Sequence, residues 1–450
     1  MKKNQLDEVN NANAAGLWEW LTLNRSNEAV LGAVLRVAHL HPQMHVAVAG
    51  PGATMFTESL ARSVQQVSVL DETGKWATNL HTQRFDTIIA NLFLFTGSDP
   101  LEAIRELSSL IKPGGRMVLT GMEAAFDAPT TSEYPRFERS QARTWLVQAG
   151  LVNCIVKRIE SAGQGGSTGW QTSLPGLFVA VGARRLAGVE EAVRENYAAI
   201  AQGEGTGCTP AAEGACCCSD EALISLDSIG GPEVGVDAIF ATDYTPEDKD
   251  ALPSQVAEFS LGCGNPTAFA ALQPGEVVLD IGSGGGLDAL IAARQVGPRG
   301  KVIGVDMTPE MLERARRAAD SAGFDNVEFR QGQADALPIE TDSVDVIISN
   351  CVINLTPDKG QVFQEAWRVL RSGGRLEVSD VVTDIAFPPD MLTAGNTWSG
   401  CVTGALPEEE YVDLIQQAGF SQVQVHRSKA AIMGGVRVYS AQVSARKCSV

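Results

Sequence analysis

The sequence has little positive charge, few histidines and no long apolar run. Its 450 residues contain no apolar stretch near the roughly 20 residues that a membrane-spanning helix requires. The 35 lysines and arginines stand against 54 acidic residues, for a net charge of −19. Nucleic acids and anionic membranes bind basic patches, so neither is expected as a partner. His426 is the only histidine in the second half, which disfavours a Cys/His pair for acyl transfer.

The amino-terminal segment has no apolar stretch after its two lysines. We therefore expect no signal peptide and a cytoplasmic location. In that compartment the nine cysteines are expected to be thiols rather than a disulfide framework. Such thiols are available for soft ligands or for redox chemistry.

A strand, a glycine turn, a helix and a second strand are predicted between residues 277 and 306. An apolar run ends at Asp280, a glycine-rich turn and a helical stretch (287–296) follow, and a second apolar run ends at Asp306. This order is typical of the opening unit of a nucleotide-binding α/β sheet. An unliganded unit of the same kind is the alternative interpretation.

The residues around this turn favour S-adenosylmethionine over a dinucleotide. The pattern is G-x-G-x-G, and Asp280 before it would repel a pyrophosphate but suit an amine or a sulfonium. Asp306 is placed to accept both ribose hydroxyls. Further contacts are expected where later strands end, at the same edge of the sheet. The predicted cofactor-binding residues are Asp280, Gly282, Ser283, Gly284, Gly286, Asp306, Met307, Ala334, Asp335 and Asn350.

The first half of the chain repeats the second. A constant offset of 259 residues pairs Asp86 with Asp345, Asn91 with Asn350, and Gly114-Gly115 with Gly373-Gly374. An offset held over about 30 residues indicates two copies of one α/β fold. The predicted architecture is therefore two Rossmann-like, doubly wound domains in tandem.

The first copy is predicted to be degenerate and non-catalytic. Aligning Gly50 with Gly282 places Val48 at the position of Asp280. The segment from Asp71 to Asp86 is also much shorter than its counterpart, so a helix and a strand are expected to be missing there. Nucleoside binding through Asp71 is the alternative. The predicted divisions are 1–185 for this domain, 186–262 for a cysteine-rich extension, 263–385 for the cofactor-binding domain and 386–450 for a substrate-binding region.

The predicted second domain carries cysteine at 216–218, 263, 351 and 401, with Cys208 and Cys448 in addition. Cys351 directly follows a strand that ends at the cofactor crevice, and Cys263 and Cys401 lie in glycine-flanked loops. Three converging thiolates beside a methyl donor suit a thiophilic acceptor. Two other interpretations are a small buried side chain and a zinc site. Zinc sites use close cysteine pairs, and only 216–218 is close-spaced here.

The stretches SLGCGNP, LDIGSGGGLD, GVDMTPEML, SNCVINLTPDK and GCVTGAL, in this order, resemble the microbial arsenite S-adenosylmethionine methyltransferases. The resemblance covers about residues 190 to 425; residues 1 to about 185 lie outside it and resemble a degenerate methyltransferase domain only in outline. It also implies that As(III) is held by Cys263, Cys351 and Cys401, with Cys216 and Cys217 as the amino-terminal pair. Which of Cys208, Cys216, Cys217 and Cys218 takes part stays open.

The same resemblance implies the chemistry and the partners. S-adenosylmethionine would be the methyl donor, and arsenic detoxification the purpose. Methyl transfer oxidises arsenic, and neighbouring cysteines could return the electrons by forming a disulfide. A thioredoxin-like protein or glutathione would then restore the thiols.

Two alternatives remain at this stage. One is a methyltransferase for a carbon or oxygen acceptor, and the other is a non-catalytic arsenic-binding protein. We also predict that a chain lacking residues 1–185 keeps measurable methylation.

Overall fold

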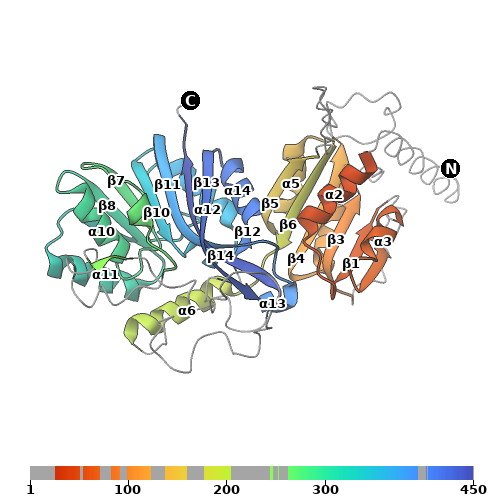
Figure 1. The fold of residues 1–450 in the computed structure, drawn as a ribbon, viewed down its shortest axis with the longest axis horizontal. Helices are drawn as coiled ribbons and strands as arrows, with labels where there is room; N and C mark the ends of the chain where they lie inside the picture. Colours follow the sequence, from red (N-terminus) through yellow and green to blue (C-terminus); the bar gives the residue numbers. More distant parts are fainter. Residues whose placement is uncertain are drawn as a thin grey trace. The chain divides into compact units, whose positions relative to one another are not determined.

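The computed structural model divides the chain into two compact units (Figure 1). Unit 1 contains Met1–Leu186 and Pro388–Thr393, and unit 2 contains Ala187–Phe387 and Ala394–Val450. The structure describes residues 26–50, 54–70, 83–91, 99–122, 137–159, 177–203, 244–246, 252, 262–393, 402 and 404–448.

Unit 1 is an α/β unit built on a six-stranded sheet in the order β2-β1-β3-β4-β6-β5. Its strands are β1 (His45–Ala49), β2 (Gln66–Leu70), β3 (Phe85–Asn91), β4 (Ile111–Met122), β5 (Leu151–Arg158) and β6 (Leu177–Arg184). Its helices are α2 (Ser26–Ala38), α3 (Thr54–Leu60), α4 (Pro100–Leu110), α5 (Arg139–Gln148) and α13 (Pro389–Thr393).

Unit 2 contains a larger sheet in the order β13-β14-β11-β10-β7-β8-β9, with β12 paired beside β11. Its strands are β7 (Val277–Ile281), β8 (Lys301–Asp306), β9 (Val327–Gln331), β10 (Val344–Asn350), β11 (Leu370–Thr383), β12 (Leu406–Pro407), β13 (Ser421–Met433) and β14 (Val436–Arg446). Its helices are α6 (Val189–Gln202), α9 (Pro266–Phe269), α10 (Leu287–Val296), α11 (Pro309–Ala322), η4 (Ile353–Leu355), α12 (Lys359–Val369) and α14 (Glu408–Gln417).

The central strands of unit 2 are buried on both faces. Val346 and Ile348 of β10 pack into the apolar core formed with α10 and α11, while Ile347 between them is also fully buried. Strands buried on both faces form continuous apolar runs in the sequence, as β10 does. The strand, turn, helix and strand predicted from 277 to 306 are confirmed as β7, α10 and β8.

Neither sheet is purely parallel. β14 pairs with β11, and β6 with β4, in antiparallel fashion. The last two strands of each unit form an antiparallel pair, β13 with β14 and β5 with β6, so each sheet is mixed. Carboxyl ends of the parallel strands still meet at one edge, where ligands bind in folds of this kind.

The two units repeat one another in detail. Asp86 accepts from the backbone N of His45 and pairs with Lys112 at 2.8 Å. Asp345, 259 residues later, accepts from the backbone N of Val277 and pairs with Arg371 at 2.8 Å. An equivalent bulge also interrupts β3–β4 pairing and β10–β11 pairing. The matching irregularities support two copies of one fold.

Unit 1 is the smaller copy. Among the described residues it has no counterpart of β9, and β2 forms the edge of its sheet. This agrees with the shorter segment before Asp86. In the described parts of the chain, every helix is too short or too polar to cross a bilayer.

Candidate functional site

The glycine turn after β7 closes against the end of β8. The backbone N–H groups of Gly282 and Ser283 both donate to the Val305 carbonyl, at 2.7 and 3.0 Å. Gly282 has a φ of +73°, and a Cβ there would lie 2.2 Å from Val352. A side chain at this position is therefore excluded by both backbone strain and contact.

Asp306 ends β8 and ties the turn to the next helix. Its carboxylate accepts from the backbone N of Gly284 at 3.0 Å and from that of Thr308 at 2.8 Å. Thr308 immediately precedes α11, but its hydroxyl donates to Asp306 and makes no capping bond to the helix. Burial raises the pKa of Asp306, and these donors partly oppose that rise.

Asp280 is a buried carboxylate, and one of its oxygens lacks a hydrogen-bond donor among the described residues. Its exposed fraction is 1%, and its Oδ2 has no hydrogen-bond partner among the described residues. Burial, followed by the charges of Asp288 and Asp306, raises the pKa of Asp280 well above its ordinary value. A buried acceptor without a donor lowers the stability of the fold. A cationic ligand beside these carboxylates would offset that loss and favour their charged form.

Asn350 connects this acidic region to the turn that holds Cys263. Its amide nitrogen lies 2.9 Å from the Tyr244 hydroxyl and 3.1 Å from Asp288, and its amide oxygen accepts from the backbone N of Cys263 at 3.1 Å. Tyr244 in turn donates to Asp288 at 2.7 Å. Burial, and then the Asp288 charge, raises the pKa of Tyr244 well above its ordinary value, so the hydroxyl stays protonated.

Cys263 and Cys351 form a disulfide, which corrects the expectation that these two are free thiols. Their Cα atoms are 5.8 Å apart although 88 residues separate them in the chain. Both side chains are buried, and Cys351 has a left-handed φ of +57° just after β10. The structure therefore brings two of the predicted sulfur ligands together, in their oxidised form.

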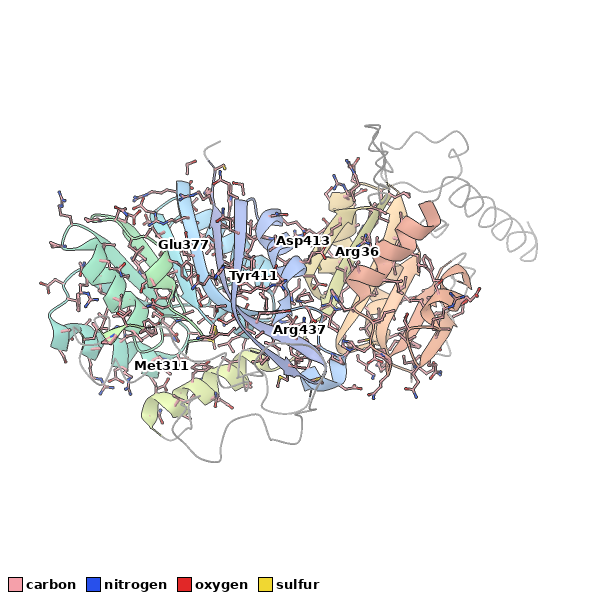
Figure 2. The ribbon with its side chains drawn as sticks, viewed as in Figure 1. Arg36, Met311, Glu377, Tyr411, Asp413 and Arg437 are labelled. Atoms are coloured by element: carbon pink, nitrogen blue, oxygen red, sulfur yellow. A yellow bond between two sulfur atoms is a disulfide. The ribbon has the colours of Figure 1, made fainter. Side chains whose placement is uncertain are left out.

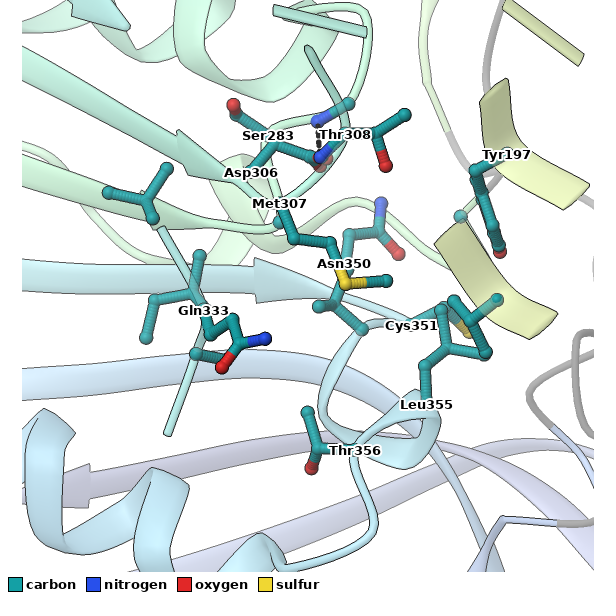
Figure 3. Close-up of a pocket in the computed structure, with 18 of the residues that line it drawn as sticks. Tyr197, Ser283, Asp306, Met307, Thr308, Gln333, Asn350, Cys351, Leu355 and Thr356 are labelled. Carbon is teal, nitrogen blue, oxygen red and sulfur yellow. Dashed lines mark hydrogen bonds between the residues drawn. The ribbon is translucent and has the colours of Figure 1, made fainter. Parts of the chain in front are cut away.

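One cavity extends from the glycine turn to Cys351, one member of this sulfur pair (Figure 3). Cys351 and Asn350 line it on the β10 side, and Met307 from the end of β8 extends into it. The predicted residues that line this cavity are Gly282, Ser283, Gly284, Asp306, Met307, Ala334, Asp335, Asn350 and Cys351.

Other predicted site residues lie elsewhere. Asp280 is buried beneath the turn, and Gly286 begins α10 with its Cα facing Ala315 and Phe329. Neither is in the cavity lining. Asp71, Cys208, Cys216, Cys217, Cys218 and Cys401 lie outside the described residues.

Several lining residues were not predicted from the sequence. Glu190, Val193 and Tyr197 face the cavity from α6, at spacings of three and four residues. That helical spacing was visible in the sequence, but nothing in it indicated which surface the helix would cover. Tyr244 and Thr356 had no periodic pattern to reveal them.

A buried charged cluster supports the loop that follows Cys351. The Lys359 ammonium is 1% exposed and donates to the carbonyls of Asn354 and Thr356, at 3.3 and 3.0 Å. The Tyr411 hydroxyl (Figure 2) donates to the fully buried Asp380 carboxylate at 3.1 Å. Burial raises the pKa of Asp380 to about 7, against the lowering effect of the Val381 N–H and of Lys359.

The residues present fit S-adenosylmethionine. Asp280 lies outside the cavity lining, but its unpartnered oxygen carries negative charge that favours the cationic parts of a donor bound in the neighbouring cavity. A Cβ at Gly284 would meet no atom within 4 Å, so the backbone there is open to a ligand. Asp306 stands at the strand end where a ribose is bound in nucleotide folds.

Comparisons with known proteins agree with this site. A family model described as a methyltransferase domain matches residues 272–419. The arsenite methyltransferase of Halobacterium salinarum is 45% identical over 240 residues, which are 52% of this chain and 58% of that protein. The arsenite methyltransferase of Homo sapiens is 43% identical over 152 residues, 32% of this chain and 40% of that protein.

A solved structure is also similar. The crystal structure of CrArsM, an arsenic(III) S-adenosylmethionine methyltransferase from Chlamydomonas reinhardtii, has 35% sequence identity and a TM-score of 0.39. That match covers 49% of this chain and 75% of the other. By contrast, the chain spans about half the length of the two curated relatives, 58% and 40% respectively.

Together, the fold and the site define a Rossmann-like S-adenosylmethionine-dependent methyltransferase. The glycine turn, the acidic strand ends and the matched domain all lie in the second half of the chain. Within this class, the chain is similar to the arsenite methyltransferases over 240 residues of one relative and 152 residues of another.

Proposed function

We propose that this protein methylates trivalent arsenic with S-adenosylmethionine and that cysteine thiolates hold the arsenic. The observation that carries the proposal is the sulfur pair at the wall of the donor cavity. Cys351 lines the same cavity as Gly284 and Asp306, and Cys263 is within bonding distance of it. Thiolates are soft ligands, which suits As(III) better than a carbon or oxygen acceptor.

The residues around the cavity have separate tasks in this proposal. Asp306 and the open backbone at Gly284 would hold the donor, and the charge of the buried Asp280 would favour its cationic groups. The donor supplies an electrophilic methyl group on its sulfonium. Cys263 and Cys351 in reduced form, with Cys401, would hold arsenic with its lone pair toward the cavity. Much of the rate would come from fixing the two reactants in near-attack geometry.

In this proposal the same sulfurs also return the electrons that arsenic loses during methyl transfer. Transfer of a methyl cation to the arsenic lone pair oxidises As(III) to As(V). Two thiolates that become a disulfide return two electrons and regenerate As(III). Cys263 and Cys351 are close enough for this bond. A dithiol protein of the thioredoxin kind, or glutathione, would then reduce the disulfide before the next turnover.

We further propose a cytoplasmic protein that detoxifies arsenic and binds neither nucleic acid nor membrane. The net charge of −19 supports the last point. Unit 1 is proposed to be non-catalytic, because the penultimate residue of its first strand is Val48, where the first strand of the catalytic sheet in unit 2 has Asp280.

The direct test is an assay with arsenite, S-adenosylmethionine and a dithiol, in which arsenic species are separated by chromatography. Methylated arsenic that requires both the donor and the dithiol supports the proposal. Binding of S-adenosylmethionine without any methylated arsenic would favour a different acceptor. If arsenite binds and S-adenosylmethionine does not, the protein is an arsenic-binding protein without catalysis.

The donor side has its own prediction. Asp306→Asn is expected to weaken S-adenosylmethionine binding by roughly 10–100-fold, since one charged acceptor is lost and charged hydrogen bonds are worth about 1.5–3 kcal/mol. Isothermal calorimetry measures the change. Asp325→Asn, an exposed acid in the same unit, is the control and should bind as wild type does. Unchanged affinity in Asp306→Asn would remove this residue from the donor site.

A further inference from the structure

Asn350 is bonded to both cysteines of the sulfur pair, although the sequence predicted it only as a contact of the donor. It ends β10, and Cys351 follows it directly in the chain. Its side-chain amide is hydrogen-bonded to Cys263, which lies 87 residues earlier in the chain. One residue is therefore covalently joined to one cysteine of the pair and hydrogen-bonded to the other.

Two hydrogen bonds join the Asn350 amide to the turn formed by residues 262–264. The amide oxygen accepts from the backbone N–H of Cys263 at 3.1 Å, and the amide nitrogen donates to the Gly264 carbonyl at 2.9 Å. An added Cβ at Gly262 would overlap the amide of Asn350. Glycine at this position therefore allows the backbone of the turn to approach the side chain closely.

Neighbouring acceptors fix the orientation of the same amide. Its nitrogen also lies 2.9 Å from the Tyr244 hydroxyl and 3.1 Å from the Asp288 carboxylate. If the nitrogen and oxygen were exchanged, the amide oxygen would face a carbonyl and a carboxylate, and neither of these can donate. Asn350 therefore presents its oxygen to Cys263 and its N–H groups to the acidic region beside the donor cavity.

A second side chain binds the other polar group of the Cys263 backbone. Ser440 of β14 is 2% exposed, and its hydroxyl donates to the Cys263 carbonyl at 3.1 Å. On the other side of the pair, the backbone N–H of Cys351 donates to the Ser379 carbonyl of β11 at 2.8 Å. Both cysteines are thus held through their backbones, by hydrogen bonds that do not involve sulfur.

We propose that Asn350 is a positioning residue that keeps Cys263 and Cys351 adjacent when their disulfide is reduced. Its bonds to the turn do not require the S–S bond, so the two thiols stay side by side before arsenic binds and again before they are oxidised. Holding two groups in place raises the effective concentration of one at the other, which favours both chelation of arsenic and disulfide formation. The part of this inference that concerns arsenic rests on the proposed function.

A glutathione redox equilibrium tests the positioning without arsenic. Two glutathione molecules reduce the disulfide to two thiols and yield one glutathione disulfide. Asn350→Ala in the full-length protein is expected to shift this equilibrium about tenfold toward the dithiol, because both hydrogen bonds to the turn are lost. Acid quenching, alkylation of free thiols and mass spectrometry of the peptides that contain Cys263 and Cys351 measure the shift.

Two further measurements extend the test. Ser440→Ala removes one bond to the Cys263 carbonyl and is expected to shift the same equilibrium about threefold in the same direction. It is the smaller change, so it decides the outcome if Asn350→Ala does not fold. In calorimetry of the reduced protein, Asn350→Ala is expected to bind arsenite about tenfold more weakly than wild type.

Asn326→Ala is the matched control, because Asn326 is another half-buried amide of unit 2. Its nitrogen donates to the carbonyls of Ala293 and Gly297, both at 3.0 Å. This variant should lower the free energy of unfolding but leave the glutathione equilibrium at the wild-type value. An equal shift in Asn326→Ala and Asn350→Ala would mean that general loss of stability, and not positioning, causes the change.

The positioning role is also refuted if Asn350→Ala and Ser440→Ala both keep the wild-type equilibrium. If Asn350→Ala weakens S-adenosylmethionine binding and leaves the glutathione equilibrium unchanged, the residue serves the donor alone. Failure of the wild type to methylate arsenite would instead contradict the proposed function, while the glutathione equilibrium would still report whether Asn350 positions the two thiols.

Discussion

Cys351→Ser is expected to lower arsenite methylation by about 100-fold or more, while S-adenosylmethionine still binds within a few fold of wild type. Serine has nearly the same size, so the left-handed backbone at this position and its bond to the Ser379 carbonyl are expected to persist. What is lost is a soft ligand to arsenic, and misplaced reactants alone can cost a factor of about 100. The variant also cannot form the bond to Cys263.

The measurement is turnover with arsenite and a dithiol, next to calorimetry with the donor. Cys448→Ser is the matched control, because Cys448 is an exposed free cysteine in the same unit. It should retain full activity. Wild-type turnover in Cys351→Ser would remove the sulfur chemistry from the proposal and favour a carbon or oxygen acceptor.

The second large effect concerns stability. Lys359→Met is expected to lower the free energy of unfolding by about 3–5 kcal/mol at pH 8, as is typical when one partner of a buried charge pair is removed. Methionine fills the space, but the Asn354 and Thr356 carbonyls lose their donor and the buried Asp380 carboxylate loses a stabilising charge. Urea denaturation measures the change.

Two comparisons separate charge from packing in this prediction. The double variant Lys359→Met, Asp380→Asn should recover much of the lost stability, because no unpaired charge then remains buried. Lys301→Met, which breaks an exposed pair with Glu328 at 2.7 Å, should change stability by less than about 1 kcal/mol. Equal losses in Lys301→Met and Lys359→Met would contradict the argument.

Asp380 also gives stability a pH dependence. Its carboxyl has a pKa of about 7 in the folded protein, against an ordinary value near 4. Between these values the folded state binds the proton more strongly than the unfolded state does, so its contribution to stability falls as the pH rises from about 4 to about 7. Above pH 7 that contribution is constant. Asp380→Asn should flatten this part of the stability profile, and an unchanged profile would assign it to other groups.

Much of the fold could be predicted from the sequence because local patterns determine it. The apolar run before Asp280, the glycines, and the helical stretch that follows are consecutive, and the structure confirms them as β7, the turn and α10. The repeat was equally visible, since a constant offset needs no knowledge of contacts. The antiparallel last strands were not predicted, because an apolar run carries no information on the direction of its neighbour.

The site was harder to predict, for two physical reasons. Tyr244 reaches Asp288 and Asn350 across distances of 44 and 106 residues, and no spacing in the sequence signals such a contact. The oxidation state of Cys263 and Cys351 depends on redox conditions as well as on residue identity. The assignment of the predicted residues to the donor and to arsenic remains a prediction that the variants above can test.

Unit 1 is discontinuous in the chain because it includes α13 (Pro389–Thr393), and this has a consequence for biosynthesis. A ribosome that has completed Leu186 must add roughly 200 more residues before Thr393 emerges. At about 5–20 residues per second, that takes about 10–40 s. During this interval the first unit lacks α13, while the strands of the second unit up to β11 are already being synthesised. The completion of unit 1 thus depends on a segment that is translated after most of the central strands of unit 2.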